Sequence, residues 1–187
     1  VDNDSQDGTI AYLKDAFPSQ LDASNDSVRL HLIANRHNVG FGRANNQALR
    51  HCKGEYVLFL NPDTILTEHT LLDCLSAARE QPKLGAIGVA MLQANGQFAP
   101  ESRRGLPTPW VAFCRMSGLT KLFPKSRKLA RYYMSYLSQE ETAPIDIVSG
   151  AFMFCSREAL NEVGGFDEDF FMYGEDIDLS YRFLKAG

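Results

Sequence analysis

Hydrophobic positions in the first hundred residues follow two periodicities in turn, and each change of period marks a new element. Apolar residues spaced three or four apart predict helices, whereas alternating or continuous apolar runs rich in branched residues predict strands. By this rule we expect helices over 10–17, over 44–53 and between Thr67 and Pro82, and strands over 28–34, 56–60 and 86–92. Alternating helices and strands predict an α/β fold with an open, mostly parallel sheet flanked by helices, in which ligands bind beyond the carboxyl ends of the strands.

The last forty residues show the same two patterns. A strand is expected over 145–155 with a break at Ser149–Gly150, then a helix capped by Ser156, and a final helix from Glu175. The helical spacing also predicts which side chains share a face of each helix. Ala44, Ala48 and Cys52 are expected on one side of their helix, and Ile177, Tyr181 and Leu184 on one face of theirs. In the helix between them, Leu71, Leu72, Leu75 and Ala78 are expected to face inward.

Residues 100–145 break this pattern, and we interpret them as an insert that is both basic and aromatic. Between Ser102 and Ser138 there are three prolines and eight basic residues but no acidic one. The basic residues are Arg103, Arg104, Arg115, Lys121, Lys125, Arg127, Lys128 and Arg131. Apolar side chains such as Trp110, Phe113, Leu122 and Phe123 are interleaved with them.

Composition excludes several classes of protein. The 187 residues carry a net charge of −4, which argues against a nucleic-acid binder. No apolar run approaches the ~20 residues that span a bilayer. Four scattered cysteines with no C-x-x-C spacing suggest neither a zinc site nor a redox pair, so we expect reduced thiols and a cytoplasmic location. The insert is the expected point of contact if the protein also meets the inner face of the membrane.

Both ends of the chain are expected to cut through a fold. Val1 to Ser5 resembles the tail of a strand that enters a loop, and Gly187 resembles the cap of a helix. We therefore expect one catalytic core over 1–187 that is truncated at both ends.

A first candidate for chemistry follows the continuous apolar strand at 56–60. Asn61-Pro62-Asp63 places a carboxylate where that strand stops. Mg²⁺ or Mn²⁺ can bind through one such carboxylate and take its other ligands from phosphates and water. The alternative is an ordinary strand-ending turn, for which these residue types are well suited.

Two further candidates suggest nucleotide binding. Asp2 and Asp4 follow the first expected strand end and can accept hydrogen bonds from a base or ribose. The alternative, which the segment favours when taken alone, is capping of the next helix by Ser5 or Asp7. Residues 38–46 form a glycine-containing loop before a helix, where Asn38, Gly40 and Arg43 could bind phosphate. The alternative is that Gly40 and Gly42 serve only a tight bend.

Glu175-Asp176 opens the last helix after an apolar stretch, 170–173. A carboxylate beside an apolar wall is a better general base, because loss of water raises its pKa. Acidic residues in a first helical turn also stabilise the helix dipole without any catalytic role.

Six short segments, taken in order, resemble family 2 glycosyltransferases, and most closely their rhamnosyltransferase-like branch. They are 1–9 (VDNDSQDGT), 38–42 (NVGFG), 58–64 (LFLNPDT), 150–153 (GAFM), 163–167 (VGGFD) and 171–176 (FMYGED). The resemblance implies the A-type glycosyltransferase fold and inverting, metal-dependent transfer of a sugar from a nucleoside diphosphate sugar to an acceptor hydroxyl. It favours a dTDP- or UDP-sugar, with rhamnose as the sugar, a glycan or lipid-linked acceptor, and a place in cell-surface polysaccharide synthesis.

The resemblance also implies roles for single residues. Asp2 would contact the base or ribose, Asp63 would bind the metal, Asp176 would be the catalytic base and Glu175 would orient the acceptor or the base. Asn61 departs from the family's D-x-D pattern, so metal binding would depend more heavily on Asp63. Two alternatives remain: a non-catalytic module that binds sugar nucleotides or glycans, and a nucleotidyltransferase.

The basic insert allows three interpretations. It can face a membrane surface or an anionic lipid-linked acceptor, or it can be a solvated loop whose aromatic residues pack on the sheet. In the third, Arg103 and Arg104 reach the donor diphosphate, because the arginine fork matches phosphate oxygens. Gly150, in the break of the 145–155 strand, is a further candidate for contact with acceptor or diphosphate.

Overall fold

The computed structural model describes residues 1–18 and 30–187, which group into two compact units. One unit comprises residues 1–53 and 165–173, and the other comprises residues 54–164 and 174–187. Each unit is described by itself. All four cysteines are free thiols.

The smaller unit contains helices α1 (Thr9–Ala16) and α3 (Phe41–Leu49). The strand expected over 28–34 forms a single parallel bridge here, between Ala34 and Asp2, while its first two residues lie outside the described part of the chain. The Asp2 N–H donates to the Ile33 carbonyl at 2.8 Å, and the Asn35 N–H donates to the Asp2 carbonyl at 3.0 Å.

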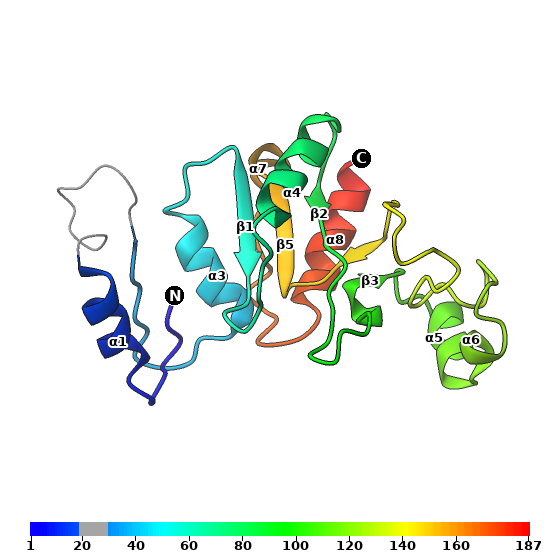
Figure 1. The fold of residues 1–187 in the computed structure, drawn as a ribbon, viewed down its shortest axis with the longest axis horizontal. Coiled ribbons are helices and arrows are strands. Elements are labelled where there is room, and N and C mark those ends of the chain that lie inside the picture. The colour runs from blue at the N-terminus through cyan, green and yellow to red at the C-terminus, as the bar shows by residue number, and fades with distance from the viewer. Residues whose placement is uncertain (19–29) are drawn as a thin grey trace. The chain divides into compact units, whose positions relative to one another are not determined.

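The larger unit is built on a three-stranded sheet with the order β1 (Tyr56–Leu60), β5 (Phe152–Ser156), β2 (Ala86–Ile87) (Figure 1). Strand β5 is antiparallel to both neighbours, with Leu60 opposite Phe152 and Ala86 opposite Cys155. Strands β1 and β2 therefore run in the same direction, but the prediction of mostly parallel pairing is wrong for this sheet. The alternation of elements records the direction of successive strands and does not reveal that a distant strand enters between them.

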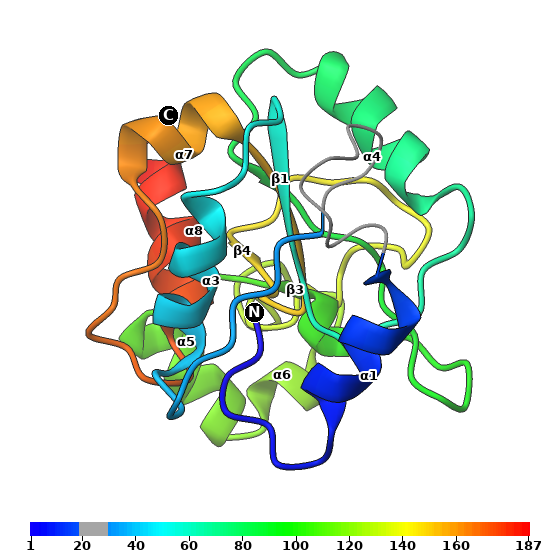
Figure 2. The ribbon, with the colours of Figure 1, turned by 90° about the vertical axis from the view of Figure 1, so that its left-hand side faces the viewer.

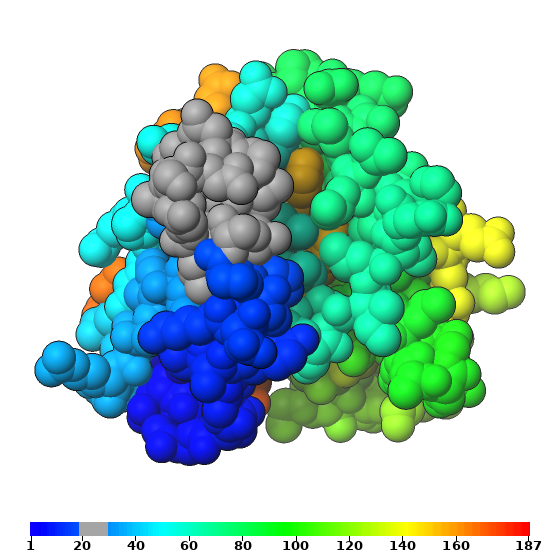
Figure 3. All heavy atoms as spheres, turned by 60° about the vertical axis from the view of Figure 1, so that its left-hand side comes forward, coloured from blue at the N-terminus to red at the C-terminus, as the bar shows by residue number. Residues whose placement is uncertain are grey.

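One face of this sheet is covered by α4 (Thr70–Arg79), whose surface is in view in Figure 3. Cys74 and Ala78 of this helix pack with Phe152 and Phe154. The expectation that Leu71 and Leu72 face inward is wrong, since both are exposed. They border an open hollow above the sheet, because the small residues Cys74 and Ala78 make the close contact.

Two helices near the C-terminus, α7 (Arg157–Val163) and α8 (Glu175–Ala186), lie side by side (Figure 2). As expected, the Ser156 hydroxyl caps α7, accepting from the Ala159 N–H at 3.4 Å. The face of α8 that carries Ile177, Tyr181 and Leu184 is not its buried face: Tyr181 and Leu184 are exposed, and the buried residues are Glu175, Leu179 and Ser180. Two of these three are polar, so hydrophobic spacing could not find this face.

The insert contains a short 3-10 turn η1 (Pro100–Ser102), strand β3 (Arg103–Arg104) and helices α5 (Pro109–Met116) and α6 (Leu119–Leu122). Strand β3 pairs antiparallel with β4 (Ile147–Val148), which ties the insert to the rest of its unit. The predicted break at Ser149–Gly150 is confirmed, because it separates β4 from β5. Among the described residues, no helix is long and apolar enough to cross a membrane.

Candidate functional site

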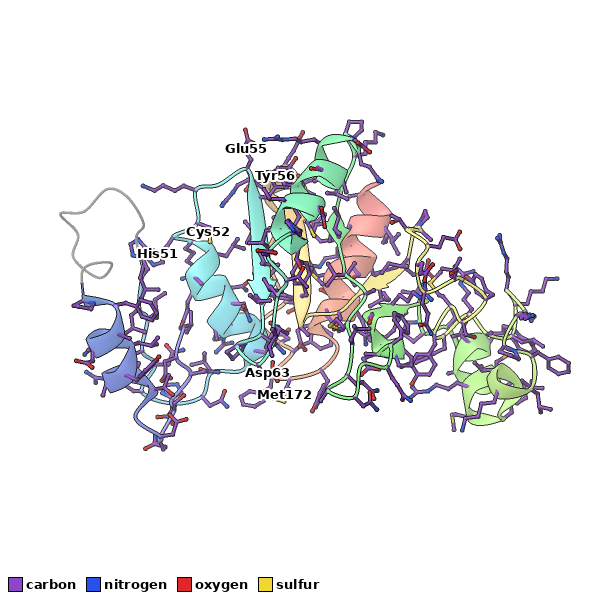
Figure 4. All side chains as sticks on the ribbon, viewed as in Figure 1. His51, Cys52, Glu55, Tyr56, Asp63 and Met172 are labelled. Carbon is purple, nitrogen blue, oxygen red and sulfur yellow. The ribbon has the colours of Figure 1, made fainter. Side chains whose placement is uncertain are left out.

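The first part of the site is the turn that follows β1. The Asn61 N–H donates to the Ala151 carbonyl at 2.9 Å, and the Thr64 hydroxyl donates to the Asn61 carbonyl at 2.7 Å. These bonds fix the turn and leave Asp63 exposed beyond one end of β1, with Tyr56 at the other end (Figure 4). The strand-ending turn is thus present, and it presents a solvent-facing carboxylate.

The second part, which we call the Asp176 cluster, consists of Arg104, Gly150 and Asp176. The Arg104 guanidinium forms an ion pair with Asp176 Oδ2, and the Gly150 N–H donates to the same oxygen at 3.2 Å. The Arg104 and Asp176 side chains are only 17% and 15% exposed. Arg104 and Gly150, from distant parts of the sequence, therefore meet at one carboxylate oxygen of Asp176, and within residues 1–18 and 30–187 its Oδ1 has no hydrogen-bond partner.

The break between β4 and β5 links these two parts. Gly150 bonds to Asp176, and the next residue, Ala151, accepts the hydrogen bond from Asn61. The turn that carries Asp63 and the start of α8 therefore attach to adjacent residues of one short segment. The larger unit thus holds a solvent-facing carboxylate and a paired carboxylate at the same end of its sheet.

Glu175 lies directly before Asp176 and is 7% exposed. Its Oε2 atom has no hydrogen-bond partner within the described residues. Burial raises the pKa of Glu175, the Asp176 charge raises it further, and its own backbone N–H and the Arg104 charge oppose the shift. A buried carboxyl oxygen without a partner is rare in folded proteins, and perturbed groups of this kind cluster at functional sites.

Arg103 does not take part in this cluster. Its guanidinium donates to the Ser138 carbonyl at 2.7 Å and to the Leu137 carbonyl at 3.0 Å, and it stands over the Phe98 ring. Arg103 therefore closes the insert back onto β3, and only Arg104 of the two arginines points to the cluster.

In the smaller unit, Asn3 is the centre of a polar network that sequence reasoning missed. Its Oδ1 accepts from the Val39 N–H at 3.0 Å and from Asn35 Nδ2 at 3.1 Å. Its Nδ2 donates to Asn38 Oδ1 at 2.8 Å, and that oxygen also accepts from the Gly40 N–H at 2.9 Å. The network joins the predicted residues Asn38 and Gly40 to the N-terminal segment.

The acidic residues of the N-terminal segment accept mainly local hydrogen bonds. Asp2 Oδ2 accepts from the Ser5 N–H at 3.0 Å, and hydrogen bonding with Ser5 lowers the pKa of Asp2. Asp4 has a left-handed backbone (φ 74°) and accepts from Gln6 Nε2 at 2.9 Å. Asp7 accepts from the Thr9 N–H at 3.1 Å. The N-cap residue of α1 is Gly8, which makes no side-chain cap bond, so the alternative of helix capping by Ser5 or Asp7 is wrong.

Two residues expected to bind phosphate have partners within the protein. Gly40 has φ 89°, and a Cβ there would lie 2.6 Å from the Phe171 carbonyl oxygen, which also accepts from the Phe41 N–H at 2.9 Å. Gly40 thus serves the close approach of Phe171 to the start of α3. Arg43 pairs with Glu168 at 3.1 Å. Both residues therefore have a structural role in the smaller unit.

Asn46 is a second polar residue that the sequence did not single out. Its Nδ2 donates to the Phe166 carbonyl at 2.8 Å, and its Oδ1 accepts from the Phe166 N–H at 3.0 Å. An asparagine inside a helix is intrinsically unfavourable, and that mismatch was the signal available in the sequence.

The residues present are compatible with a divalent cation held mainly by a ligand. Within residues 1–18 and 30–187, no three side chains of His, Cys, Asp or Glu gather into a metal site. Mg²⁺ and Mn²⁺ need only one or two protein carboxylates when phosphates and water supply the remaining ligands. The exposed carboxylate of Asp63 meets that smaller requirement.

Comparison with known proteins identifies the family of the chain. The sequence model of Glycosyl transferase family 2 matches residues 1–164. The chain belongs to this family. The match includes the turn at Asp63, Arg104 and Gly150, and it ends before α8 begins.

Several curated family members are similar to the chain along most of its length. An N-acetylglucosaminyl-diphospho-decaprenol L-rhamnosyltransferase of Mycobacterium tuberculosis is 29% identical, covering 100% of this chain and 60% of that protein. Rhamnosyltransferase WbbL of Escherichia coli is 30% identical, covering 79% of this chain and 55% of that protein. The chain thus spans about 60% of the length of the first of these relatives.

A solved structure supports the fold. Mannosyltransferase PcManGT from Pyrobaculum calidifontis, in complex with GDP-Man and Mn²⁺, superposes with a TM-score of 0.64 at 21% identity, covering 100% of this chain and 42% of that one. The chain has the fold of this glycosyltransferase, as the resemblance implied.

Proposed function

We propose that the protein is an inverting glycosyltransferase that moves a sugar, with rhamnose favoured, from a dTDP- or UDP-sugar to an acceptor hydroxyl. The acceptor is a glycan or lipid-linked saccharide of cell-surface polysaccharide synthesis. The rhamnosyltransferases among its relatives support the sugar and the acceptor class, because one of them is named for a decaprenol-linked acceptor.

The Asp176 cluster is the observation that carries this proposal. Arg104 and the Gly150 N–H both bind Oδ2 and fix the carboxylate, while Oδ1 is available to receive a proton. In the proposed step the acceptor hydroxyl gives its proton to Oδ1, and its oxygen forms a bond to the anomeric carbon. The bond from that carbon to the diphosphate oxygen breaks on the opposite face, and the nucleoside diphosphate leaves with the electron pair. Attack and departure on opposite faces invert the anomeric configuration.

Other residues position the substrates. We assign Glu175 to orienting the acceptor or the base, because its carboxyl group is buried directly beside Asp176 in the first turn of α8. Asp2 is assigned to the ribose or base, and Asp63 would hold a divalent cation. When bound, such a cation supplies positive charge that stabilises the departing diphosphate.

The proposal is tested by incubating the protein that carries this chain with a panel of nucleoside diphosphate sugars, a saccharide acceptor and Mn²⁺. We expect release of nucleoside diphosphate together with a product of inverted anomeric configuration. A retained configuration, or tight sugar-nucleotide binding without any transfer in the full protein, would contradict the proposal. The second result would favour a non-catalytic binding module.

The metal assignment has its own test. Mn²⁺ should strengthen binding of dTDP or UDP to the unaltered protein, measured by calorimetric titration. Asp63→Ala should remove that enhancement without unfolding the protein, because the side chain is exposed. Glu68→Ala, which removes another exposed carboxylate a few residues later, is the matched control and should keep the enhancement. Full metal enhancement in the Asp63 variant would show that the cation is held elsewhere.

A further inference from the structure

Helix α5 exposes an apolar stripe although its inner side is already buried. Val111 and Cys114 are the buried residues of this helix. Trp110, Phe113 and Met116 follow one another at intervals of three residues and are 54%, 54% and 87% exposed. A helix with apolar residues on both sides is typical of a helix that has a second apolar neighbour.

Helix α6 extends this apolar surface. It contacts α5, and Figure 1 shows the two short helices side by side at one end of the larger unit. Leu122 and Phe123, at the end of α6, are 70% and 51% exposed. The Trp110 and Phe113 rings stack on each other at 5.7 Å. Two adjacent helices thus present five large apolar side chains to solvent, which is far from the scattered single exposures of an ordinary surface.

The positive charges of the insert fall into two groups. Four arginines bind within the protein: Arg103 to backbone carbonyls, Arg104 to Asp176, Arg115 to Tyr133 and Arg131 to Asp146. The other four cations, which follow the start of α6, are exposed: Lys121, Lys125, Arg127 and Lys128. None of these three lysines forms an ion pair with the described part of the chain.

We propose that residues 109–128, the α5–α6 lobe, seat on the surface of an anionic lipid bilayer. The apolar side chains enter the boundary between headgroups and acyl chains, as in interfacial amphipathic helices. The lysines extend toward lipid phosphates, since their long stems allow the charged ends to remain in water. This inference does not depend on the proposed sugar transfer.

Charge complementarity favours an anionic bilayer as the partner of the α5–α6 lobe. A surface that joins aromatic residues with cations and contains no carboxylate matches a bilayer that is apolar inside and negative outside. Outside residues 109–128 the chain has 14 basic and 23 acidic residues, so a second copy of the chain is the competing partner. The experiment must therefore distinguish binding to a bilayer from binding to a second copy of the chain.

Co-sedimentation with vesicles measures the charge dependence. We expect binding to phosphatidylcholine vesicles that contain phosphatidylglycerol, weak binding to phosphatidylcholine alone, and release at high salt. Each lysine near such a surface strengthens binding roughly fivefold, so Lys121→Gln, Lys125→Gln and Lys128→Gln together should weaken it about a hundredfold. The matched control replaces three exposed lysines elsewhere, Lys14, Lys53 and Lys83, and should change binding less than threefold.

Trp110 gives a direct test of insertion, because it is the chain's single tryptophan. Its fluorescence should shift to the blue with anionic vesicles and stay unchanged with neutral ones. Phe113→Ser with Leu122→Ser should weaken binding roughly tenfold or more, since both side chains are exposed and are expected to enter the interface.

Several results would overturn the proposal. These are equal binding to both vesicle types, no binding to either, no fluorescence shift, or an equal loss in the lysine control. Sedimentation velocity without lipid tests the competing partner, a second copy of the chain. Self-association that the lysine substitutions abolish, without vesicle binding, would assign the lobe to a second copy of the chain.

Discussion

Two acidic stretches of this chain look alike in sequence and differ in what their carboxylates contact. In the N-terminal stretch, Asp2 and Asp7 accept hydrogen bonds from residues two or three positions away. In the stretch that opens α8, Asp176 binds Arg104, 72 residues away, and Gly150, 26 residues away. Glu175 beside it is buried, with one oxygen unsatisfied within the described residues.

The difference shows also in the direction of the pKa shifts. Hydrogen bonding with Ser5 and Thr9 lowers the pKa of Asp2 and of Asp7. Burial raises the pKa of Glu175. Carboxylates whose hydrogen-bond partners are local stabilise a turn. Carboxylates that are partly buried and held by distant residues are suited to bind and deprotonate a ligand.

The largest effect on stability is expected at Arg104. Arg104→Ala leaves the Asp176 carboxylate, which is 15% exposed, without its charged partner. Loss of one partner from a buried pair costs several kcal/mol, and we expect about 3 kcal/mol in the free energy of unfolding. Chemical denaturation of both proteins measures this value.

A double-mutant cycle is the control for that prediction. If the cost comes from the unpaired charge, Arg104→Ala should be clearly less destabilising in a protein that already carries Asp176→Asn. An equal cost in both backgrounds would mean that Arg104 stabilises the fold by packing alone.

A smaller effect is expected in how stability depends on pH. The folded protein holds the Glu175 proton more tightly than the unfolded chain, because the pKa of Glu175 is raised. This contribution is fully present below the ordinary glutamate pKa of about 4.3 and is lost as the pH rises through the elevated value. Glu175→Gln should therefore gain stability relative to the unaltered protein as the pH rises. A difference between the two that stays constant with pH would contradict the assignment.

The smallest effect, of opposite sign, is expected at Asp7. Its lowered pKa stabilises the fold above the ordinary aspartate pKa of about 3.9, and the contribution is lost as the pH falls through the lowered value. Asp7→Asn should reduce the acid sensitivity of α1 slightly. Amide hydrogen exchange in α1 at two acidic pH values measures the difference, and Asp15→Asn is the control within the same helix.

The sequence predicted elements well where local periodicity is sufficient. Strand β1 and the break before β5 lie where the pattern placed them. The pairing of β5 between β1 and β2 could not be predicted, because register depends on residues about 95 positions apart in the chain. The buried face of α8 was not predicted for a related reason. Glu175 and Ser180 occupy buried positions that hydrophobic spacing assigns to solvent.

The candidate site was likewise predicted only in part. Residue types and spacing identified Asp63, Asp176, Arg104 and Gly150, but they gave no reason to join the last three at one oxygen. Asn3 was not predicted because an asparagine that bridges backbone groups carries no distinctive motif, and Asn46 had only the weak signal of an asparagine inside a helix. Side-chain-to-backbone bonds of this kind depend on which segments the fold brings together.

Turnover of Asp176→Asn, compared with Asp178→Asn, tests the central claim most directly. Both substitutions remove one negative charge from the first turn of α8, but Asp178 pairs with Arg182 and lies outside the Asp176 cluster. In the full protein we expect Asp176→Asn to lower the rate of sugar transfer by roughly 10²- to 10⁴-fold with nucleotide affinity nearly intact. Asp178→Asn should change the rate by less than about tenfold, because a helix-dipole contribution is worth only ~0.3–1 kcal/mol. Near-normal transfer by a folded Asp176→Asn protein would contradict the account.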